Sequence, residues 1–365
     1  MVDRWSKSMI IFEANDMTVP PHESGMHTFM YRGQGCETLR EAVQRPFAVG
    51  KVHHMPLRPD EKIEDYLWGQ YYLPPGQWSC LYETVIIQNI FAARGLAPRI
   101  YGVGAWQDKY GQLRPVQITD DLGKCDWGQD RAEVYAMYDH ITALGRQMGM
   151  AVPGRDSGVQ NVVAGKWVDF GGFSLLPEYE AQLTERFWQG TRWGDRPYQQ
   201  ILGANNAVDT CRDMEARIAD LGLDTLDFTP RHVLDIGCSG GQFLNYLTRH
   251  YNARGTGYDT ARAIPSAAEY SAYIGAWNID YHVAALEKPV TGMGSHDLVL
   301  FLSMSRHVGL PEYVKDAAQK RLIVELHSEH EAEAAGWLAD DFDIIREHRS
   351  ADYNRLVLHA ERKHA

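Results

Sequence analysis

A glycine cluster and two aspartates in the second half of the chain have the types and spacing of a ligand site. Residues 233–243 read VLDIGCSGGQF, with Asp235 inside the apolar part of the run. Gly237 permits a sharp turn, and the two later glycines let the backbone approach a ligand where a helix begins. Asp259 lies 24 residues beyond Asp235, at the end of the next apolar run, where a carboxylate can bind ribose hydroxyls.

A second group of polar residues, in the first half, contains the groups that phosphoryl transfer needs. Asp156 precedes Asn161 by five positions, and Asp169 begins an Asp-Phe-Gly run eight positions later. Phosphoryl transfer uses a carboxylate for the incoming hydroxyl, and an amide and a second carboxylate that hold Mg²⁺. The pattern is typical of a site for Mg²⁺ and a phosphate donor.

The second half of the chain alternates between strand and helix patterns. The apolar runs are strand candidates, and the stretches between them have helical patterns, as at 262–273 and 311–319. This alternation favours a mostly parallel sheet covered on both faces. The runs near 342–347 and 355–360 are joined by a short polar stretch and predict an antiparallel hairpin at the end of the sheet. The strand candidates are 232–236, 255–258, 297–302, 321–326 and 355–360.

The first half has a different pattern and reads as α+β. Short β-like runs extend to about residue 119, and helices are expected at 79–94 and 130–148. A short hairpin is expected around Ala164 and Gly165. We therefore expect two domains, 1–180 and 181–365, the second opening with a helical linker.

Length and composition limit the classes of protein. The chain has 365 residues, 44% hydrophobic and 23% charged, which fits two soluble globular domains. A net charge of −12 disfavours a nucleic-acid partner. Five scattered cysteines without a CxxC pair indicate reduced thiols, and no apolar run predicts a membrane span or a signal peptide. We expect a cytoplasmic protein, and a homo-oligomer stays open.

The glycine run resembles the first motif of class I S-adenosylmethionine-dependent methyltransferases, an acidic residue followed by a G-x-G-x-G loop. The resemblance covers roughly residues 190–365 and implies a Rossmann-like sheet, with a methyl group transferred by direct displacement at the sulfonium. It also implies that His307, in the loop after the fourth strand, is a candidate base, with Glu325 and His327 as alternatives. The residues that it places at the cofactor are Asp235, Gly237, Ser239, Gly240, Gly241, Asp259 and Leu286.

Residues 154–171 resemble the catalytic core of protein kinases and of small-molecule kinases with a related fold. Gly154 replaces the histidine of the family's H-R-D motif, and the long helical lobe that normally follows Asp-Phe-Gly is missing. The resemblance implies that Asp156 is the base, that Asn161 and Asp169 hold Mg²⁺, and that ATP is the cofactor. It further implies that Lys51 contacts phosphates and that Glu83 is its helical partner, while Gly33-Gln34-Gly35 is a degenerate glycine-rich loop.

The two resemblances together predict a methyltransferase with a kinase-like N-terminal domain. The expected acceptor is a small molecule, a glycan or a glycan phosphate. The content is similar to that of bifunctional kinase–methyltransferases that cap bacterial O-antigen chains, so one alternative is a bifunctional enzyme that phosphorylates and then methylates a glycan terminus. The other alternative is a methyltransferase whose kinase-like domain is a scaffold or substrate-binding module without catalysis.

Overall fold

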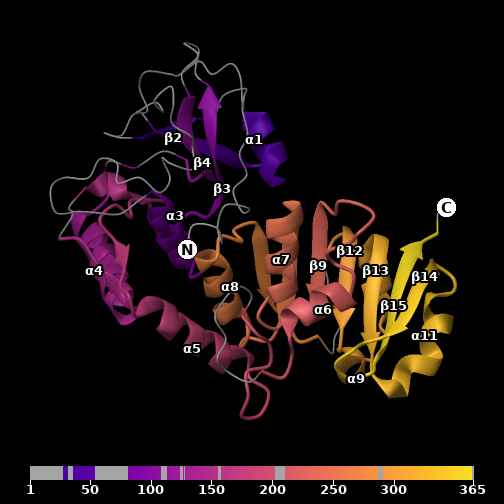
Figure 1. Cartoon of the computed structure of the whole chain (residues 1–365). Coiled ribbons are helices and arrows are strands. Elements are labelled where there is room, and N and C mark those ends of the chain that lie inside the picture. Colours follow the sequence, from indigo (N-terminus) through magenta and orange to yellow (C-terminus); the bar gives the residue numbers. More distant parts are fainter. Residues whose placement is uncertain are drawn as a thin grey trace. The chain divides into compact units, whose positions relative to one another are not determined.

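The computed structural model divides the chain into two compact units (Figure 1). One unit comprises Met1–Leu183 with Ala272–Trp277, and the other comprises Thr184–Ser271 with Asn278–Ala365. The structure describes residues 28–31, 36–53, 81–107, 113–123, 126, 128–154, 158–201, 210–286, 290 and 292–363. The assignment of separate functions to 1–180 and 181–365 remains a prediction.

A seven-stranded sheet forms the centre of the second unit. Its order is β11-β10-β9-β12-β13-β15-β14, and Figure 1 shows β9, β12, β13, β15 and β14 side by side in that order. The first five strands are parallel to their neighbours, whereas β15 is antiparallel to both β13 and β14. The strands are β9 (His232–Ile236), β10 (Arg254–Asp259), β11 (Ile279–Val283), β12 (His296–Leu302), β13 (Ala318–Leu326), β14 (Phe342–Arg349) and β15 (Leu356–Arg362).

The expected strands are present because their apolar runs are buried in the sheet. Val233, Leu234 and Leu300 are fully buried, as a strand covered on both faces requires. The terminal hairpin is also present, as β14 and β15. Strand β11 was not expected, because its sequence IDYHV lies at the sheet edge with only Ile279 buried and so lacks an apolar run.

Six helices of the described residues connect and cover these strands, and all of them except the last two residues of α8 belong to the second unit. They are α6 (Met214–Asp220), α7 (Gln242–Tyr251), α8 (Ile264–Tyr273), α9 (Ser305–Val308), α10 (Glu312–Ala317) and α11 (Glu331–Leu338). Helix α7 starts directly after Gly241 and ends at Asn252, and both residues have left-handed backbone conformations. Its buried side chains, including Phe243, Leu244 and Leu247, attach it to the sheet, so the end of β9 and the start of α7 are held rigidly.

The first unit contains an antiparallel sheet of order β1-β2-β4-β3. Its strands are β1 (Thr28–Tyr31), β2 (Ala48–His53), β3 (Ile100–Gln107) and β4 (Leu113–Asp120). Helix α1 (Cys36–Val43) connects β1 to β2, and α3 (Leu81–Ala92) precedes β3. Gly33-Gln34-Gly35 lies outside the described residues, so the glycine-rich loop stays a prediction.

The remainder of the first unit combines one long helix with short strands. Helix α4 (Arg131–Gln147) begins at Asp130, whose carboxylate accepts a hydrogen bond from the N–H of Ala132. The expected hairpin around Ala164 and Gly165 is present. The other elements are β5 (Met150–Ala151), the short 3-10 turn η2 (Val159–Asn161), β6 (Val162–Val163), β7 (Lys166–Trp167), β8 (Ser174–Leu175) and α5 (Tyr179–Thr191), which continues into the second unit.

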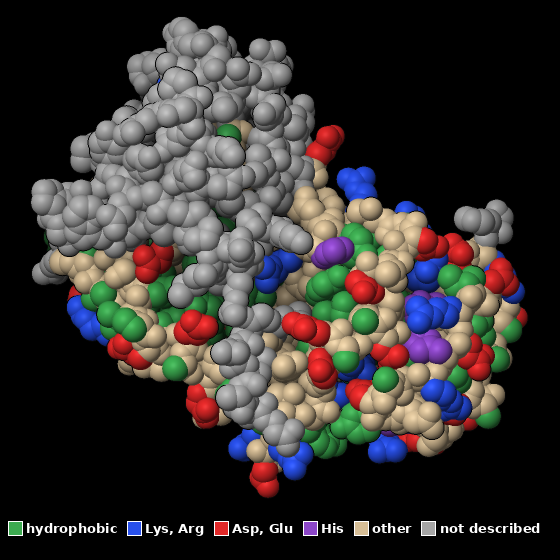
Figure 2. Space-filling view, viewed as in Figure 1, with side chains coloured by type: hydrophobic (Ala, Val, Ile, Leu, Met, Phe, Trp, Pro, Cys, Tyr) green, Lys and Arg blue, Asp and Glu red, His purple; other side chains and the backbone are tan. Residues whose placement is uncertain are grey.

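The described surface carries charged side chains of both signs. On the face shown in Figure 2, acidic and basic side chains are interspersed, with hydrophobic side chains scattered among them. Within the described part of the chain, none of the helices has the length and apolar character needed to cross a membrane.

Candidate active site

The glycine loop at the end of β9 is tightly enclosed by side chains. Gly237 and Gly241 have φ values of 80° and 69°, in the left-handed region that favours glycine. A Cβ on Gly237 would lie 2.3 Å from Met304 Sδ, and one on Gly241 would lie 2.0 Å from Tyr281 Oη. At Gly240 a Cβ would lie 2.2 Å from the Phe187 ring. Side chains of other elements therefore fill the space beside these glycines, so no larger residue fits at any of the three positions.

Asp259 fixes the glycine loop through hydrogen bonds to backbone amides. Its Oδ2 accepts from the N–H of Ser239 at 2.7 Å, and its Oδ1 accepts from the N–H of Thr260 at 2.6 Å. Ser239 has a φ of 50°, so the contact holds a non-glycine residue in a strained conformation. The side chain of Asp259 remains partly exposed. The end of β10 and the loop after β9 are thereby joined at the carboxyl edge of the sheet, the edge where open α/β sheets bind ligands.

Asp235 supplies a buried carboxylate beside this loop. It is 2% exposed, and Oδ2 has no hydrogen-bond partner among the described residues. Burial, together with the charge of Asp259, raises its pKa to about 8, although Arg217 opposes the rise. An acceptor that lacks a partner is costly, so it fits a site completed by a ligand with N–H donors. The loop and this carboxylate together fit the amino-acid part and ribose of S-adenosylmethionine.

The remaining two residues predicted for the methyl-transfer site have different surroundings. Leu286 is 6% exposed and belongs to the core of the second unit, and its carbonyl accepts a hydrogen bond from Tyr313 Oη at 3.0 Å. His307 is exposed on α9, with its ring centroid 6.4 Å from that of His327. His307 is thus exposed to solvent, while Leu286 is part of the hydrophobic core.

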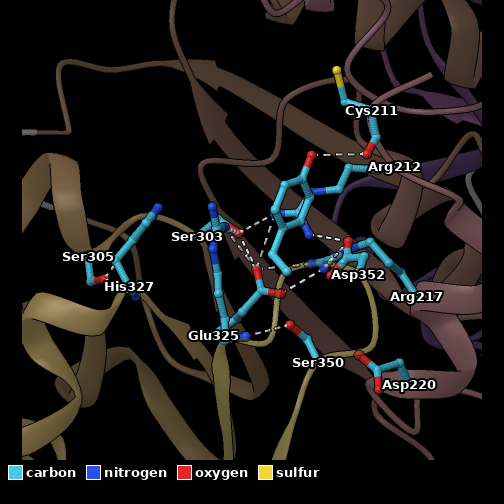
Figure 3. A network of polar contacts seen from close by, with 12 residues as sticks. Cys211, Arg212, Arg217, Asp220, Ser303, Ser305, Glu325, His327, Ser350 and Asp352 are labelled. Atoms are coloured by element: carbon cyan, nitrogen blue, oxygen red, sulfur yellow. Dashed lines mark hydrogen bonds and ion pairs between the residues drawn. The ribbon is translucent and has the colours of Figure 1, made fainter. Parts of the chain in front are cut away.

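A network of arginines and carboxylates lies at the carboxyl ends of β12 and β13 (Figure 3). Glu325 is fully buried and pairs with Arg217 at 2.7 Å, with Arg355 at 3.5 Å and with Arg212 at 3.7 Å. Ser303 also donates its hydroxyl to Glu325. Burial alone would raise the pKa of Glu325, but the neighbouring charges, Arg217 first, lower it to about 2. Glu325 therefore holds structure and is not available as a base.

His327, the other alternative base, has a fixed and neutral ring. His327 is 6% exposed, and its backbone N–H donates to Ser305 Oγ at 3.0 Å. The Ser305 hydroxyl also lies 3.2 Å from His327 Nδ1. Burial, followed by the charges of Arg355 and Arg306, lowers the pKa of His327 to about 4. The ring is therefore neutral near pH 7.

Sequence patterns did not identify the arginines of this network. Arg212 donates to Asp352, and Arg217 lies 3.3 Å from the same carboxylate. Arg212 also stacks over the ring of Tyr353, with its guanidinium carbon 4.1 Å from the ring centroid. These residues come from segments far apart in the sequence, and none belongs to a local motif. The only available signal was the position of Glu325 and His327 at the end of a predicted strand.

In the first unit, Lys51 and Asp169 lie near each other. Lys51 on β2 donates to the carbonyl of Val168 at 3.4 Å. Burial lowers its pKa, and the charge of Asp169 partly opposes that effect. Asp169 is exposed, and its Oδ1 accepts from the N–H of Gly171 at 2.9 Å, so the carboxylate faces a turn. The ammonium of Lys51 is therefore close to the carboxylate of Asp169, and a nucleotide site needs one group of each charge.

Glu83 and Asn161 have other contacts. Glu83 Oε1 accepts from the backbone N–H of Leu175 at 2.6 Å, and burial raises its pKa. Asn161 is 4% exposed, and its carbonyl accepts from the N–H of Val168 at 2.9 Å. Asp156 lies outside the described residues. Among the residues that the structure describes, no group of three or more His, Cys, Asp or Glu side chains could hold a metal.

Comparison with known proteins identifies one part of the chain. Residues 233–325 match the family model described as a methyltransferase domain. A ubiquinone biosynthesis O-methyltransferase of Nitrosococcus oceani is 36% identical over 93 residues, which is 25% of this chain and 39% of that protein. The match thus spans well under half of that relative. The second unit carries a class I S-adenosylmethionine-dependent methyltransferase domain.

Solved structures with similar folds are more distant. A magnesium protoporphyrin IX methyltransferase from Synechocystis PCC 6803 is 22% identical, with a TM-score of 0.35 over 41% of this chain and 77% of that one. The bifunctional kinase–methyltransferase WbdD is 19% identical, with a TM-score of 0.37 over 47% of this chain and 44% of that one. With both TM-scores below 0.5, these structures add nothing to what the sequence match shows.

Proposed function

We propose that the methyltransferase domain transfers a methyl group from S-adenosylmethionine to a small-molecule, glycan or glycan-phosphate acceptor. The observation that carries this proposal is the pair Asp235 and Asp259 on either side of a closely enclosed glycine loop. When bound, S-adenosylmethionine supplies a methyl group activated by its sulfonium. The rate then depends mainly on holding donor and acceptor in line, which a rigid loop favours.

Each residue has a distinct role in this proposal. Asp259 binds the ribose hydroxyls, and Asp235 accepts hydrogen bonds from the amino group of the donor. The backbone of Gly237, Ser239, Gly240 and Gly241 contacts the donor directly, and Leu286 packs against its adenine. Where the acceptor is a hydroxyl, His307 on α9 removes its proton.

Titration calorimetry with S-adenosylhomocysteine tests the donor site. We expect one site per chain, with affinity about 30-fold weaker in Asp259→Ala because a charge-assisted hydrogen bond is lost. Asp280→Ala, which changes a partly buried carboxylate paired with Arg254, is the matched control and should bind as the wild type does. Absence of binding to the wild type at millimolar ligand would overturn the proposal.

A second candidate function is phosphoryl transfer from Mg-ATP by the first unit, giving a bifunctional enzyme that phosphorylates and then methylates a glycan terminus. The observation favouring it is the half-buried ammonium of Lys51, which bonds to the carbonyl of Val168 and lies close to Asp169. In this proposal Lys51 contacts phosphates and Glu83 orients it. Asp156 accepts the acceptor's proton, while Asn161 and Asp169 hold Mg²⁺.

Titration of Mg-ATP into the protein saturated with S-adenosylhomocysteine tests this candidate. Binding near one equivalent that is lost in Asp169→Ala but kept in Asp139→Ala, an exposed site on α4, would support a nucleotide site. No heat at millimolar nucleotide would refute it. The first unit would then be a scaffold or substrate-binding module.

A further inference from the structure

The ring of His327 lies in a positively charged environment. After burial, the charges of Arg355 and Arg306 are the main causes that lower its pKa, and His307 acts in the same direction. Glu329 opposes them, but its carboxylate is exposed and paired with Arg306 at 2.8 Å. Two arginines, Arg355 and Arg306, therefore lie close to a neutral ring at the carboxyl edge of the sheet, and open α/β sheets bind their ligands at this edge, so the arrangement suggests an anionic partner.

The guanidinium of Arg355 has hydrogen-bond donors that can bind a ligand. Arg355 uses Nη1 to donate to Ser303 Oγ at 2.5 Å, and its Nε and Nη2 have no hydrogen-bond partner among the described residues. The Arg355 side chain is 20% exposed, so these donors can reach a ligand. A guanidinium with one edge free is suited to bidentate binding of a carboxylate or phosphate.

The ring of His327 is arranged as a donor. Ser305 Oγ accepts from the backbone N–H of His327, so its own proton is available for Nδ1. The N–H of Arg306 also points to Nδ1, at 3.4 Å. With Nδ1 accepting, the proton of the neutral ring is on Nε2. Nε2 has no partner among the residues that the structure describes.

The side chains of Arg355 and His327 are connected to the glycine loop through neighbouring residues of the chain. Met304, whose sulfur lies 2.3 Å from the position of a Cβ on Gly237, stands between Ser303 and Ser305 in the chain. Ser303 contacts Arg355, and Ser305 contacts His327. Ser303 and Ser305 therefore hold Arg355 and His327, and both serines are next in sequence to Met304, which packs on the glycine loop.

The charge balance of the surrounding network also favours an anion. Three guanidinium groups, of Arg212, Arg217 and Arg355, meet two carboxylates, of Glu325 and Asp352. One positive charge is left over within this cluster, and Arg212 Nε is buried without a partner among the described residues. Buried charges are stable when they are paired, so an incoming anion would complete the set.

We propose that Arg355 and His327 bind an oxyanion of the methyl acceptor, a carboxylate or a phosphate, and so determine acceptor specificity; this inference rests on the proposed methyl transfer. An oxygen lone pair of that anion forms the new O–C bond as the C–S bond breaks, and the C–S electron pair stays on sulfur. The products are a methyl ester and S-adenosylhomocysteine. Because the oxygen carries no proton, His307 has no proton to remove and the reaction needs no base.

Nuclear magnetic resonance of the histidine Cε1–H groups tests the anion site. The full chain, saturated with S-adenosylhomocysteine, is titrated separately with inorganic phosphate and with acetate, and His327→Gln identifies the His327 signal. We expect the anion to shift this signal and to raise the pKa of His327 from about 4. Arg355→Gln should weaken anion binding about tenfold. Arg254→Gln, which changes the first residue of β10 at the amino ends of the strands, should not weaken it.

Each outcome decides the proposal. A shift with phosphate alone assigns a phosphate acceptor, and one with acetate alone assigns a carboxylate. No shift with either anion, or equal anion binding in wild type and Arg355→Gln, would overturn the anion site. If S-adenosylhomocysteine still binds in that case, the methyl-transfer proposal stands. If Arg355→Gln loses the fold, Arg355→Lys keeps the charge without the fork and should still weaken binding. Failure of S-adenosylhomocysteine to bind would instead refute the methyltransferase proposal.

Discussion

Asp235 is expected to release a proton when the methyl-donor site is filled. Its pKa of about 8 means that about nine-tenths of the protein carries a protonated Asp235 at pH 7. A ligand ammonium beside Oδ2 favours the ionised form. If binding lowers the pKa below about 6, about 0.8 proton leaves each protein at pH 7 and only about 0.1 at pH 9.

Calorimetry in two buffers measures this release directly. S-adenosylhomocysteine is titrated in buffers of different ionisation enthalpy, and the difference between the observed heats gives the number of protons. Asp235→Asn should abolish the buffer dependence, whereas Asp224→Asn, which removes an exposed carboxylate of the same unit, should retain it. Binding with the same heat in both buffers at pH 7 would refute the assignment of Asp235 to the donor's amino group.

The same carboxylate makes stability depend on pH in a defined direction. A folded-state pKa raised above the ordinary value contributes stability that is complete at low pH and is lost as pH rises toward 8. Between pH 5 and pH 7 the free energy of unfolding of the ligand-free wild type should fall by about 2.7 kcal/mol more than that of the Asp235→Asn variant, measured by urea unfolding. Arg217→Met should cost about 3 kcal/mol, since it removes the nearest partner of buried Glu325, and adding Glu325→Leu should recover most of it. Gly241→Ala should lower the melting temperature through its positive φ and the contact with Tyr281, whereas Gly336→Ala, in a helix with open space around it, should raise it slightly.

The elements around the proposed donor site could be predicted because their signals are local. A short apolar strand, a glycine turn and a helix start are contiguous from residue 232 to 251, and each follows from neighbouring residues. Asp259 could be found because it ends the next strand, and parallel strands end at the same sheet edge. The hairpin β14–β15 followed from two apolar runs joined by a short polar turn.

The arginine–carboxylate network around Glu325 could not be predicted, because its residues meet only after folding. Arg212 precedes α6, Arg217 lies within it, and Arg355 follows the turn after β14, so no window of sequence contains the network. An arginine in a helix is ordinarily a surface residue, and nothing local indicates that Arg217 is 4% exposed. For the same reason Glu325 could be proposed as an alternative base to His307, although its ion pairs exclude that role.

The position of β15 has a consequence for the order in which the sheet is completed during synthesis. Strand β14 is hydrogen-bonded only to β15 in the described sheet, and β15 is the later of the two in the chain. A nascent chain that has emerged only as far as residue 355 can assemble the parallel part of the sheet, but the edge of β13 stays open. That edge carries Leu322, Val324 and Leu326, which are fully buried in the finished fold. Until β15 has emerged from the ribosome, this edge is a template on which another unfinished chain could pair.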